Sequence, residues 1–391
     1  MTIIFFDDQS RDTLFPLTFT RPVADLRIGI LKISEKWLHH LKGESAYLTA
    51  SYLQAKFPFR FSSDNLYING SICPDVKVLE AIDKLKEGDV LIKDSICIAA
   101  RSIDSNFNFN DLLKFKKITF EYELLKIYYP EDIFKFNDRE LRADFNLLTK
   151  GKISKQLSNT NTIIGEDIFV EEGVEAECSS FNTKNGPIYL GKNAQVWEGT
   201  HIRGALALCD NSQIKMGAKI YGATTIGPNS RVGGEINNAV IWGNSSKGHD
   251  GYLGNAVLGE WCNIGADSNN SNLKNNYAEV KLWDYNNQRF RKTGLQFCGL
   301  IMADHAKCAI NTMFNTGTVV GLGANVFGSG FPRNFVPDFA WGGAHGFEVY
   351  ALNKMFETVE KVFVRRNQNF DQTEKDILTH LFNYTEQYRR F

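Results

Sequence analysis

The most regular arrangement of apolar positions in this chain has a period of six residues. Eight consecutive positions at this spacing are aliphatic: Leu190, Val196, Ile202, Leu208, Ile214, Ile220, Ile226 and Val232. A step of six residues rotates steadily around an α-helix, so this period excludes a single helical face. It is the repeat of a left-handed parallel β-helix, in which each unit supplies one short strand and one turn. We therefore predict a β-helix over residues 156–345.

The two flanking segments follow other patterns. Over residues 346–391 the apolar residues recur every three or four positions, which predicts C-terminal helices, and Asp371 with Glu374 forms a capping pair for the last one. Residues 1–155 alternate short apolar runs with helical stretches, which indicates an α/β domain with a Rossmann-like sheet. The predicted strands are 3–6, 66–68, 90–92 and 96–99, and the predicted helices are 30–41 and 76–85.

Glycine, charge and cysteine narrow the class of protein further. Only five of the 32 glycines precede residue 158, which agrees with a change of architecture near residue 155, since the turns of a β-helix use glycine. The formal net charge of −1 gives no basic field for nucleic acid. Seven scattered cysteines without a CxxC pair favour reduced thiols. With no long apolar run and no signal peptide, we expect a cytoplasmic protein without nucleic-acid or membrane partners.

Four segments of the β-helix region carry the motifs of one enzyme family. Residues 246–254 read S-K-G-H-D-G-Y-L-G, residues 263–266 read N-I-G-A, residues 275–277 read N-N-Y and residues 297–299 read F-C-G. In order and approximate spacing they resemble S-K-x-G-H-x-x-Y-x-G, N-I-G-A, N-Y-D-G and F-V-G-S of bacterial glucosamine-1-phosphate acetyltransferases. Those domains form the C-terminal half of the bifunctional N-acetylglucosamine-1-phosphate uridylyltransferase.

This resemblance implies an acyl transfer to an amine. His249 would be the general base, because histidine accepts a proton near neutral pH. Tyr252 and Asn276 would hold the sugar and the imidazole, and Lys247 would meet the sugar phosphate. The resemblance also implies acetyl-CoA or another acyl-CoA as co-substrate, and a homotrimer with sites between neighbouring chains. The residues alone leave open that His249 is a solvated turn histidine.

Three N-terminal segments resemble sugar-1-phosphate nucleotidyltransferases. Residues 11–22 contain R-D-T-L-F-P-L-T and then R-P, similar to the family's G-x-G-T-R-L-x-P-L-T…P-K. Residues 136–141, F-N-D-R-E-L, look like V-N-x-R-x-x-L, and residues 67–71, Y-I-N-G-S, stand where the family has a strand ending in Gly-Asp. The resemblance implies attack of a sugar phosphate on the α-phosphate of a nucleoside triphosphate, with Mg²⁺.

The candidate residues for that reaction are basic or oxygen-bearing. The loop at residues 7–10 reads D-D-Q-S and lacks the glycines that bring backbone N–H groups to phosphates. Arg11, Arg21 and Arg27 would supply positive charge instead. Asn137, with Asp75, would hold Mg²⁺. The alternative is that this Arg/Asp-rich segment forms structural salt bridges in a domain that does not catalyse.

The sequence therefore predicts a transferase that joins a sugar-1-phosphate nucleotidyltransferase-type domain to a CoA-dependent acyltransferase-type β-helix. Its partners would be a sugar phosphate, a nucleoside triphosphate and a CoA thioester. Two alternatives stay open. One is an acyltransferase whose N-terminal domain is non-catalytic, and the other is a non-catalytic trimeric scaffold that binds a nucleotide sugar.

Overall fold

A computed structural model describes residues 1–103 and 115–391, and these residues form two compact units. The first unit contains residues 1–26 and 31–129, and the second contains residues 27–30 and 130–391. No helix among the described residues combines the length and apolar character that crossing a membrane requires.

The first unit is built on a six-stranded mixed sheet in the order β2-β1-β3-β5-β4-β6. The three strands β1, β2 and β3 run parallel, whereas β5 is antiparallel to both of its neighbours. The strands are β1 (Thr2–Phe6), β2 (Glu44–Leu48), β3 (Asn65–Asn69), β4 (Asp89–Lys93), β5 (Ile96–Arg101) and β6 (Lys116–Thr119). The helices are α1 (Ser10–Thr13), α2 (Ile33–His40) and α3 (Val76–Ile82), with 3-10 turns at Val23–Asp25 and Ser51–Leu53.

This unit confirms the predicted α/β pattern, with further strands added. The four predicted strands are β1, β3, β4 and β5, and the two predicted helices are α2 and α3. The two edge strands, β2 and β6, were not predicted, because their residues E-S-A-Y-L and K-K-I-T are mostly exposed or half-buried and include polar and charged side chains. Strands buried on both faces read as continuous apolar runs, and edge strands do not.

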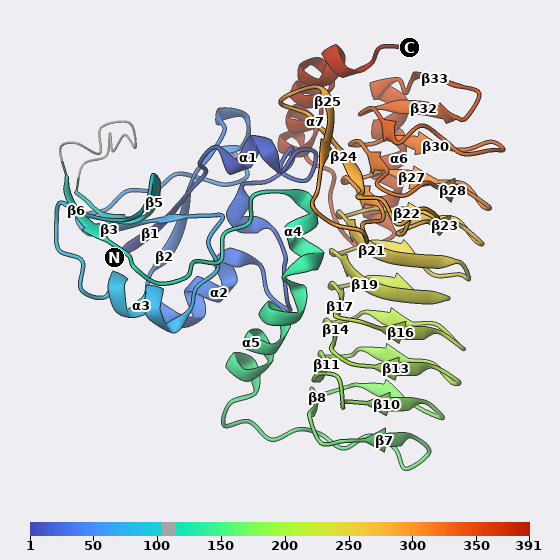
Figure 1. Cartoon of the computed structure of the whole chain (residues 1–391), viewed down its shortest axis with the longest axis horizontal. Coiled ribbons are helices and arrows are strands. Elements are labelled where there is room, and N and C mark those ends of the chain that lie inside the picture. Colours follow the sequence, from blue (N-terminus) through green and yellow to red (C-terminus); the bar gives the residue numbers. More distant parts are fainter. Residues whose placement is uncertain (104–114) are drawn as a thin grey trace. The chain divides into compact units, whose positions relative to one another are not determined.

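The second unit is a left-handed parallel β-helix with three faces, seen in Figure 1 as a stack of short strands. The first face contains β7 (Thr162–Ile164), β10 (Ser180–Asn182), β13 (His201–Arg203), β16 (Lys219–Tyr221) and the first halves of the longer strands β19 (Glu235–Ile241) and β21 (Tyr252–Leu258), followed by the pair β23 (Asn269–Asn270) and β28 (Met313–Phe314). The second contains β8 (Ile168–Val170), β11 (Ile188–Leu190), β14 (Leu206–Leu208), β17 (Thr224–Ile226), the second halves of β19 and β21, and then β26 (Ile301–Met302), β29 (Val319–Val320) and β31 (Phe335–Val336).

The third face and the additions complete this unit. The third face contains β9 (Glu175–Ala176), β12 (Gln195–Val196), β15 (Gln213–Ile214), β18 (Arg231–Val232), β20 (Ser246–Lys247), β22 (Asn263–Ile264), β27 (Lys307–Cys308), β30 (Asn325–Val326), β32 (Ala340–Gly343) and β33 (Gly346–Val349). The additions are the hairpin β24 (Lys281–Asp284) and β25 (Arg289–Lys292), the helices α6 (Leu352–Val364) and α7 (Gln372–Tyr384), and a 3-10 turn, η4 (Thr385–Tyr388).

The six-residue period corresponds directly to this coil. Leu190 pairs with Leu208, and Leu208 pairs with Ile226, so one coil takes 18 residues, or three units of six. All eight aliphatic positions of the repeat are at most 2% exposed. Stacking of these side chains along the axis forms the core of the second unit, because each unit alone cannot bury its apolar face.

Helices from the segments before and after the β-helix in the sequence pack within the second unit. α4 (Pro130–Lys135) contacts β19 and β21, and α5 (Asn137–Thr149) contacts β17. These contacts place residues 130–155 with the second unit, whereas the sequence-based division at residue 155 assigned them to the first. The predicted C-terminal helices are α6 and α7, and the Asp371 carboxylate accepts a 2.9 Å hydrogen bond from the backbone N–H of Glu374 as predicted.

Candidate functional site

Polar side chains gather at the carboxyl ends of the three parallel strands of the first unit. Asp7 and Asp8 follow β1, Thr49 follows β2, and Asn69 is the last residue of β3. In open α/β sheets, ligands bind outside the carboxyl ends of the strands. This edge is therefore the candidate site of the first unit.

A buried lysine, Lys126, joins these strand ends. A backbone bridge to Ile72 holds it beside the end of β3, and its side chain is 4% exposed. The ammonium lies 2.9 Å from a carboxylate oxygen of Asp8 and donates to the hydroxyl of Ser71 at 2.7 Å and to that of Ser10. A buried charge persists only when it is paired and hydrogen-bonded, and this cluster supplies both conditions.

Asp8 is held in its ionised form by the same cluster. Burial alone would raise its pKa, but the Lys126 ammonium and hydrogen bonds from Ser10 and Asn69 outweigh that effect and lower the pKa. The Asn69 amide donates to Asp8 at 2.9 Å and to the Cys97 carbonyl at 3.0 Å. The result is a fixed ion pair at the candidate ligand edge of the sheet.

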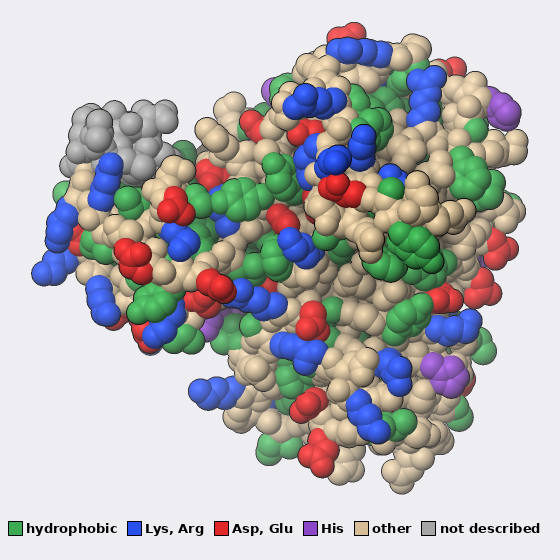
Figure 2. Space-filling view, viewed as in Figure 1, with side chains coloured by type: hydrophobic (Ala, Val, Ile, Leu, Met, Phe, Trp, Pro, Cys, Tyr) green, Lys and Arg blue, Asp and Glu red, His purple; other side chains and the backbone are tan. Residues whose placement is uncertain are grey.

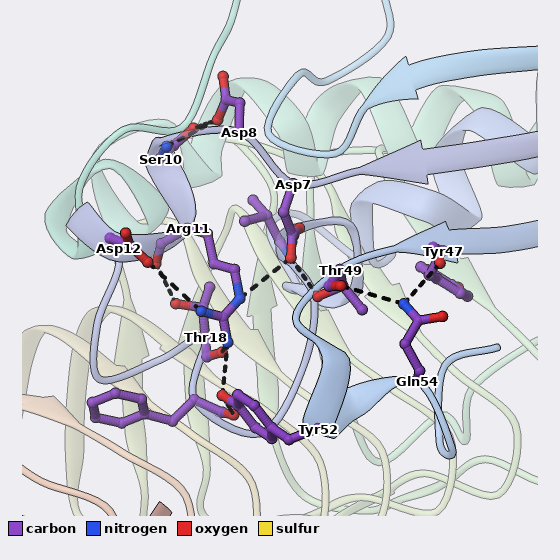
Figure 3. A network of polar contacts seen from close by, with 12 residues as sticks. Asp7, Asp8, Ser10, Arg11, Asp12, Thr18, Tyr47, Thr49, Tyr52 and Gln54 are labelled. Carbon is purple, nitrogen blue, oxygen red and sulfur yellow. Dashed lines mark hydrogen bonds and ion pairs between the residues drawn. The ribbon is translucent and has the colours of Figure 1, made fainter. Parts of the chain in front are cut away.

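The pKa of the neighbouring residue, Asp7, is shifted in the opposite direction. Burial raises its pKa to about 6, although the Thr49 hydroxyl, the Arg11 guanidinium and the Val23 backbone N–H each act to lower it. Figure 3 shows Asp7 between Arg11 and Thr49, with Arg11 Nε 3.3 Å from Asp7 Oδ2. Asp7 therefore changes protonation in a pH range where Asp8 stays charged.

The predicted phosphate-binding arginines Arg11 and Arg21 lie in this unit and make internal contacts. Arg11 donates to the Tyr52 hydroxyl at 2.7 Å and to the Thr18 carbonyl at 3.1 Å (Figure 3). Arg21 is 4% exposed and lies 3.5 Å from Asp25. Their contact with phosphate stays a prediction.

The predicted residues Arg27 and Asn137 both belong to the second unit. The Arg27 guanidinium donates to the Ile30 carbonyl inside the buried segment 27–30. The Asn137 side chain is 0% exposed, accepts from the Gly29 backbone N–H at 2.7 Å, and donates to the Ala223 carbonyl at 2.9 Å. These contacts give Asn137 a structural role, and its predicted role as a magnesium ligand is untested.

Asp75, the other predicted magnesium ligand, caps a helix. Its carboxylate accepts from the Val78 backbone N–H at 2.9 Å at the start of α3. Within the described residues, no cluster of three or more His, Cys, Asp or Glu side chains is arranged to hold a metal ion. Asp7 and Asp8 are consecutive in the sequence, but Figure 3 shows their carboxyl groups pointing away from each other, and each has its own set of partners. Mg²⁺ sites often use a single carboxylate plus substrate phosphates.

In the β-helix, Lys247 is a core residue. It ends β20, pairs in register with Val232, and is 2% exposed. Its ammonium donates to the Gly233 carbonyl at 3.1 Å and to the His249 carbonyl at 2.7 Å, and burial lowers its pKa to about 8. The side chain therefore fixes the turn that carries His249.

The other predicted β-helix residues lie on the surface or near it. His249 is exposed, and the half-buried Tyr252 accepts at its hydroxyl from the Asn272 amide at 2.9 Å. Asn276 is exposed and accepts from the Ala278 backbone N–H at 3.1 Å, within its own loop. The structure brings Lys247, His249 and Tyr252 into one turn and the strand that follows it.

Some members of these clusters differ in how far the sequence alone identifies them. Asp7 and Asp8 carried a usable signal, because two acids directly after a predicted strand lie at the ligand edge of the sheet. Asn272, which also donates to Asn255 at 2.7 Å, and Lys126 had no local signal. Lys126 reaches Asp8 across 118 residues of sequence.

The first part of the chain matches a known family. Residues 3–153 match the family model described as sugar nucleotidyl transferase. A curated relative, the bifunctional protein GlmU of Methanocaldococcus jannaschii, is 31% identical over 87 residues. That match covers 22% of this chain and 21% of the relative, so the chain spans about a fifth of the length of the curated relative it matches.

Solved structures of acyltransferases also show a likeness to part of this chain. AntD, an N-acyltransferase from Bacillus cereus solved as a point mutant with dTDP and coenzyme A, is 13% identical, with a TM-score of 0.22 over 53% of this chain and 92% of its own. The UDP-N-acetylglucosamine acyltransferase from Campylobacter jejuni is 15% identical, with a TM-score of 0.26 over 59% of this chain and 85% of its own. Residues 3–153 thus match the sugar nucleotidyl transferase family, and the order of that segment before a left-handed β-helix resembles the bifunctional GlmU proteins.

Proposed function

We propose that the first unit catalyses nucleotidyl transfer to a sugar 1-phosphate. A phosphate oxygen of the sugar phosphate attacks the α-phosphorus of a nucleoside triphosphate and forms the new P–O bond. The bond between the α-phosphorus and its bridging oxygen breaks, and pyrophosphate leaves with the bonding electrons. The products are a nucleotide sugar and pyrophosphate.

Lys126 is the observation that carries this proposal. An ammonium that is 4% exposed at the ends of β1 and β3 is a preorganised positive charge at the edge where ligands bind. Phosphoryl transfer depends mainly on positioning and on such charge stabilisation. The match of residues 3–153 to sugar nucleotidyl transferases supports the same reaction.

The other groups of the cluster have roles that follow from their contacts. Asp8, Ser10 and Ser71 fix the position of the Lys126 ammonium, and Arg11 and Arg21 add positive charge to the same unit. Mg²⁺, when bound, would be held by Asp8, the more exposed of the two acids, together with the triphosphate and would neutralise phosphate charge.

The test is pyrophosphate release from panels of nucleoside triphosphates and sugar 1-phosphates. Lys126→Met is expected to lower the rate by about 10²–10³-fold, the usual effect of removing one charge-stabilising group. Lys84→Met is the matched control, because Lys84 is an exposed lysine of the same unit. No turnover with any pair, or a rate unchanged in Lys126→Met, would contradict the proposal.

A second proposed function, CoA-dependent acyl transfer by a homotrimer, is favoured by one observation in the β-helix. Lys247 donates to the His249 carbonyl and so holds an exposed histidine on a fixed turn. His249 would take a proton from the attacking amine, whose nitrogen forms the new bond to the acyl carbon as the C–S bond breaks and the thiol leaves.

Release of free thiol from acetyl-CoA in the presence of amino-sugar phosphates measures this activity. His249→Ala is expected to abolish the release, whereas His201→Ala, another exposed histidine of the β-helix, is expected to leave it unchanged. Thiol release without pyrophosphate release would identify an acyltransferase alone. Binding of a nucleotide sugar without either reaction would identify a scaffold. Sedimentation of the full chain tests the trimer.

A further inference from the structure

The second unit contains a cavity that belongs to neither of these sites. It has a volume of about 510 Å³, within the range of about 300–1,000 Å³ that is usual for small-molecule sites. It lies between the β24–β25 hairpin, strand β31 and the C-terminal η4 turn. Six aromatic residues line it: Trp283, Phe290, Phe335, Phe347, Tyr388 and Phe391.

The aromatic rings offer both a rigid floor and an open stacking face. Trp283 and Phe335 stack with their centroids 4.3 Å apart and their planes 12° apart. Phe290 meets Trp283 edge-on at 5.4 Å and remains 42% exposed. The Nε1 donor of Trp283 is buried and has no hydrogen-bond partner within residues 1–103 and 115–391. A planar ligand would stack on the exposed face of Phe290 without needing to reach this buried donor.

The charged side chains that line the cavity are positive. Arg333 and Arg390 line it, and its lining side chains include no carboxylate. Arg390 donates to the Gln288 side chain at 2.7 Å and to the Gln387 carbonyl at 3.2 Å. Figure 2 shows further Lys and Arg side chains gathered on the part of the second unit that carries β24, β25 and α7. Arginine side chains bind phosphate bidentately and also stack on planar rings.

We propose that this cavity binds a nucleoside phosphate. The base stacks on the exposed face of Phe290 and the Trp283–Phe335 pair, and the phosphates pair with Arg333 and Arg390. A nucleoside triphosphate and the adenosine phosphate part of coenzyme A share this chemistry. The site is independent of nucleotidyl transfer, because none of its lining residues belongs to the first unit.

Calorimetric titration of the full chain with UTP, ATP, coenzyme A and inorganic pyrophosphate tests the proposal. The Lys126→Met chain is used, so that binding at the first unit is weakened. Nucleotides are expected to bind at one site per chain, and pyrophosphate at least fivefold more weakly, because one base stack contributes about 1–3 kcal/mol. Binding by coenzyme A as tight as ATP would identify it as a ligand, and weaker binding would identify free nucleotides.

Variants of exposed residues locate the site without endangering the fold. Arg333→Ala/Arg390→Ala is expected to weaken nucleotide binding at least tenfold, and Phe290→Ala at least fivefold. Arg365→Ala, an exposed arginine at the end of α6 outside the cavity, is the control. The double arginine variant should release pyrophosphate at the wild-type rate, which separates this site from the proposed catalytic one.

Three results would overturn the proposal. They are no saturable nucleotide binding at millimolar concentrations, nucleotide affinity unchanged in Arg333→Ala/Arg390→Ala, and pyrophosphate binding as tight as the nucleotides. Photolabelling of the otherwise wild-type chain with 8-azido-ATP covers the case in which Lys126→Met does not fold. Labelled peptides from residues 283–290 or 333–337 support the site, and labelling confined to the first unit contradicts it.

Discussion

The ammonium of Lys126 lies 2.9 Å from a carboxylate oxygen of Asp8, at the carboxyl end of β1 in a position that is almost closed to solvent. Removing one partner of such a pair leaves an uncompensated buried charge, which costs more free energy than removing both partners. The pair therefore makes a prediction for stability that is separate from its proposed role in catalysis.

Asp8→Asn is expected to lower the free energy of unfolding of the first unit by about 3–5 kcal/mol. Asp8→Asn/Lys126→Met is expected to recover a large part of that loss, because no unpaired charge remains. Urea denaturation followed by circular dichroism measures both. Equal destabilisation by the single and double variants would show that the ion pair is not what holds this edge together.

Asp7 predicts a pH dependence of stability. Its pKa in the folded state is about 6, above its ordinary value of 3.8, so the stability it contributes is complete below pH 3.8 and is lost as the pH rises through 6. The gap corresponds to about 3 kcal/mol. We expect Asp7→Asn to gain stability relative to the wild type between pH 4 and 7, measured by urea denaturation at several pH values. A difference independent of pH would contradict the assignment.

A variant of Asn137 distinguishes a structural role of this side chain from a role as a magnesium ligand. Asn137→Ala removes the acceptor of the Gly29 N–H and the donor to the Ala223 carbonyl, so we expect a loss of about 2–4 kcal/mol in unfolding free energy. Thermal unfolding with and without Mg²⁺ tests the alternative. If Mg²⁺ raises the melting temperature of the wild type and not of the variant, Asn137 binds the metal.

The buried Lys247 predicts that its contribution to the stability of the second unit changes with pH in the direction opposite to that of Asp7. Burial lowers its pKa from 10.5 to about 8, so the stability it contributes is complete above pH 10.5 and is lost as the pH falls through 8. Lys247→Met keeps the buried side chain without the charge. The variant is therefore expected to gain stability relative to the wild type as the pH falls from 10.5 to 7, measured by denaturation in buffers across that range. Parallel pH curves would contradict this account.

The sequence alone determined the β-helix, because a six-residue period encodes a local strand and turn that repeat along the chain. The aliphatic positions from Leu190 to Val232 all face the core, as the period requires. The same local logic identified β1 and β3 in the first unit, since strands buried on both faces are continuous apolar runs.

Only the tertiary structure decided which polar residues meet. Lys126 finds Asp8 and Ser71 because the segment that carries Lys126 pairs with the residues after β3, and no local pattern encodes that pairing. Asn137 is satisfied by Gly29 and Ala223, and Lys247 faces the core, because burial forces each polar group to find a partner wherever the chain brings one. Such partners are set by long-range packing, which brings together residues that are far apart in the sequence and leaves no local pattern to identify them.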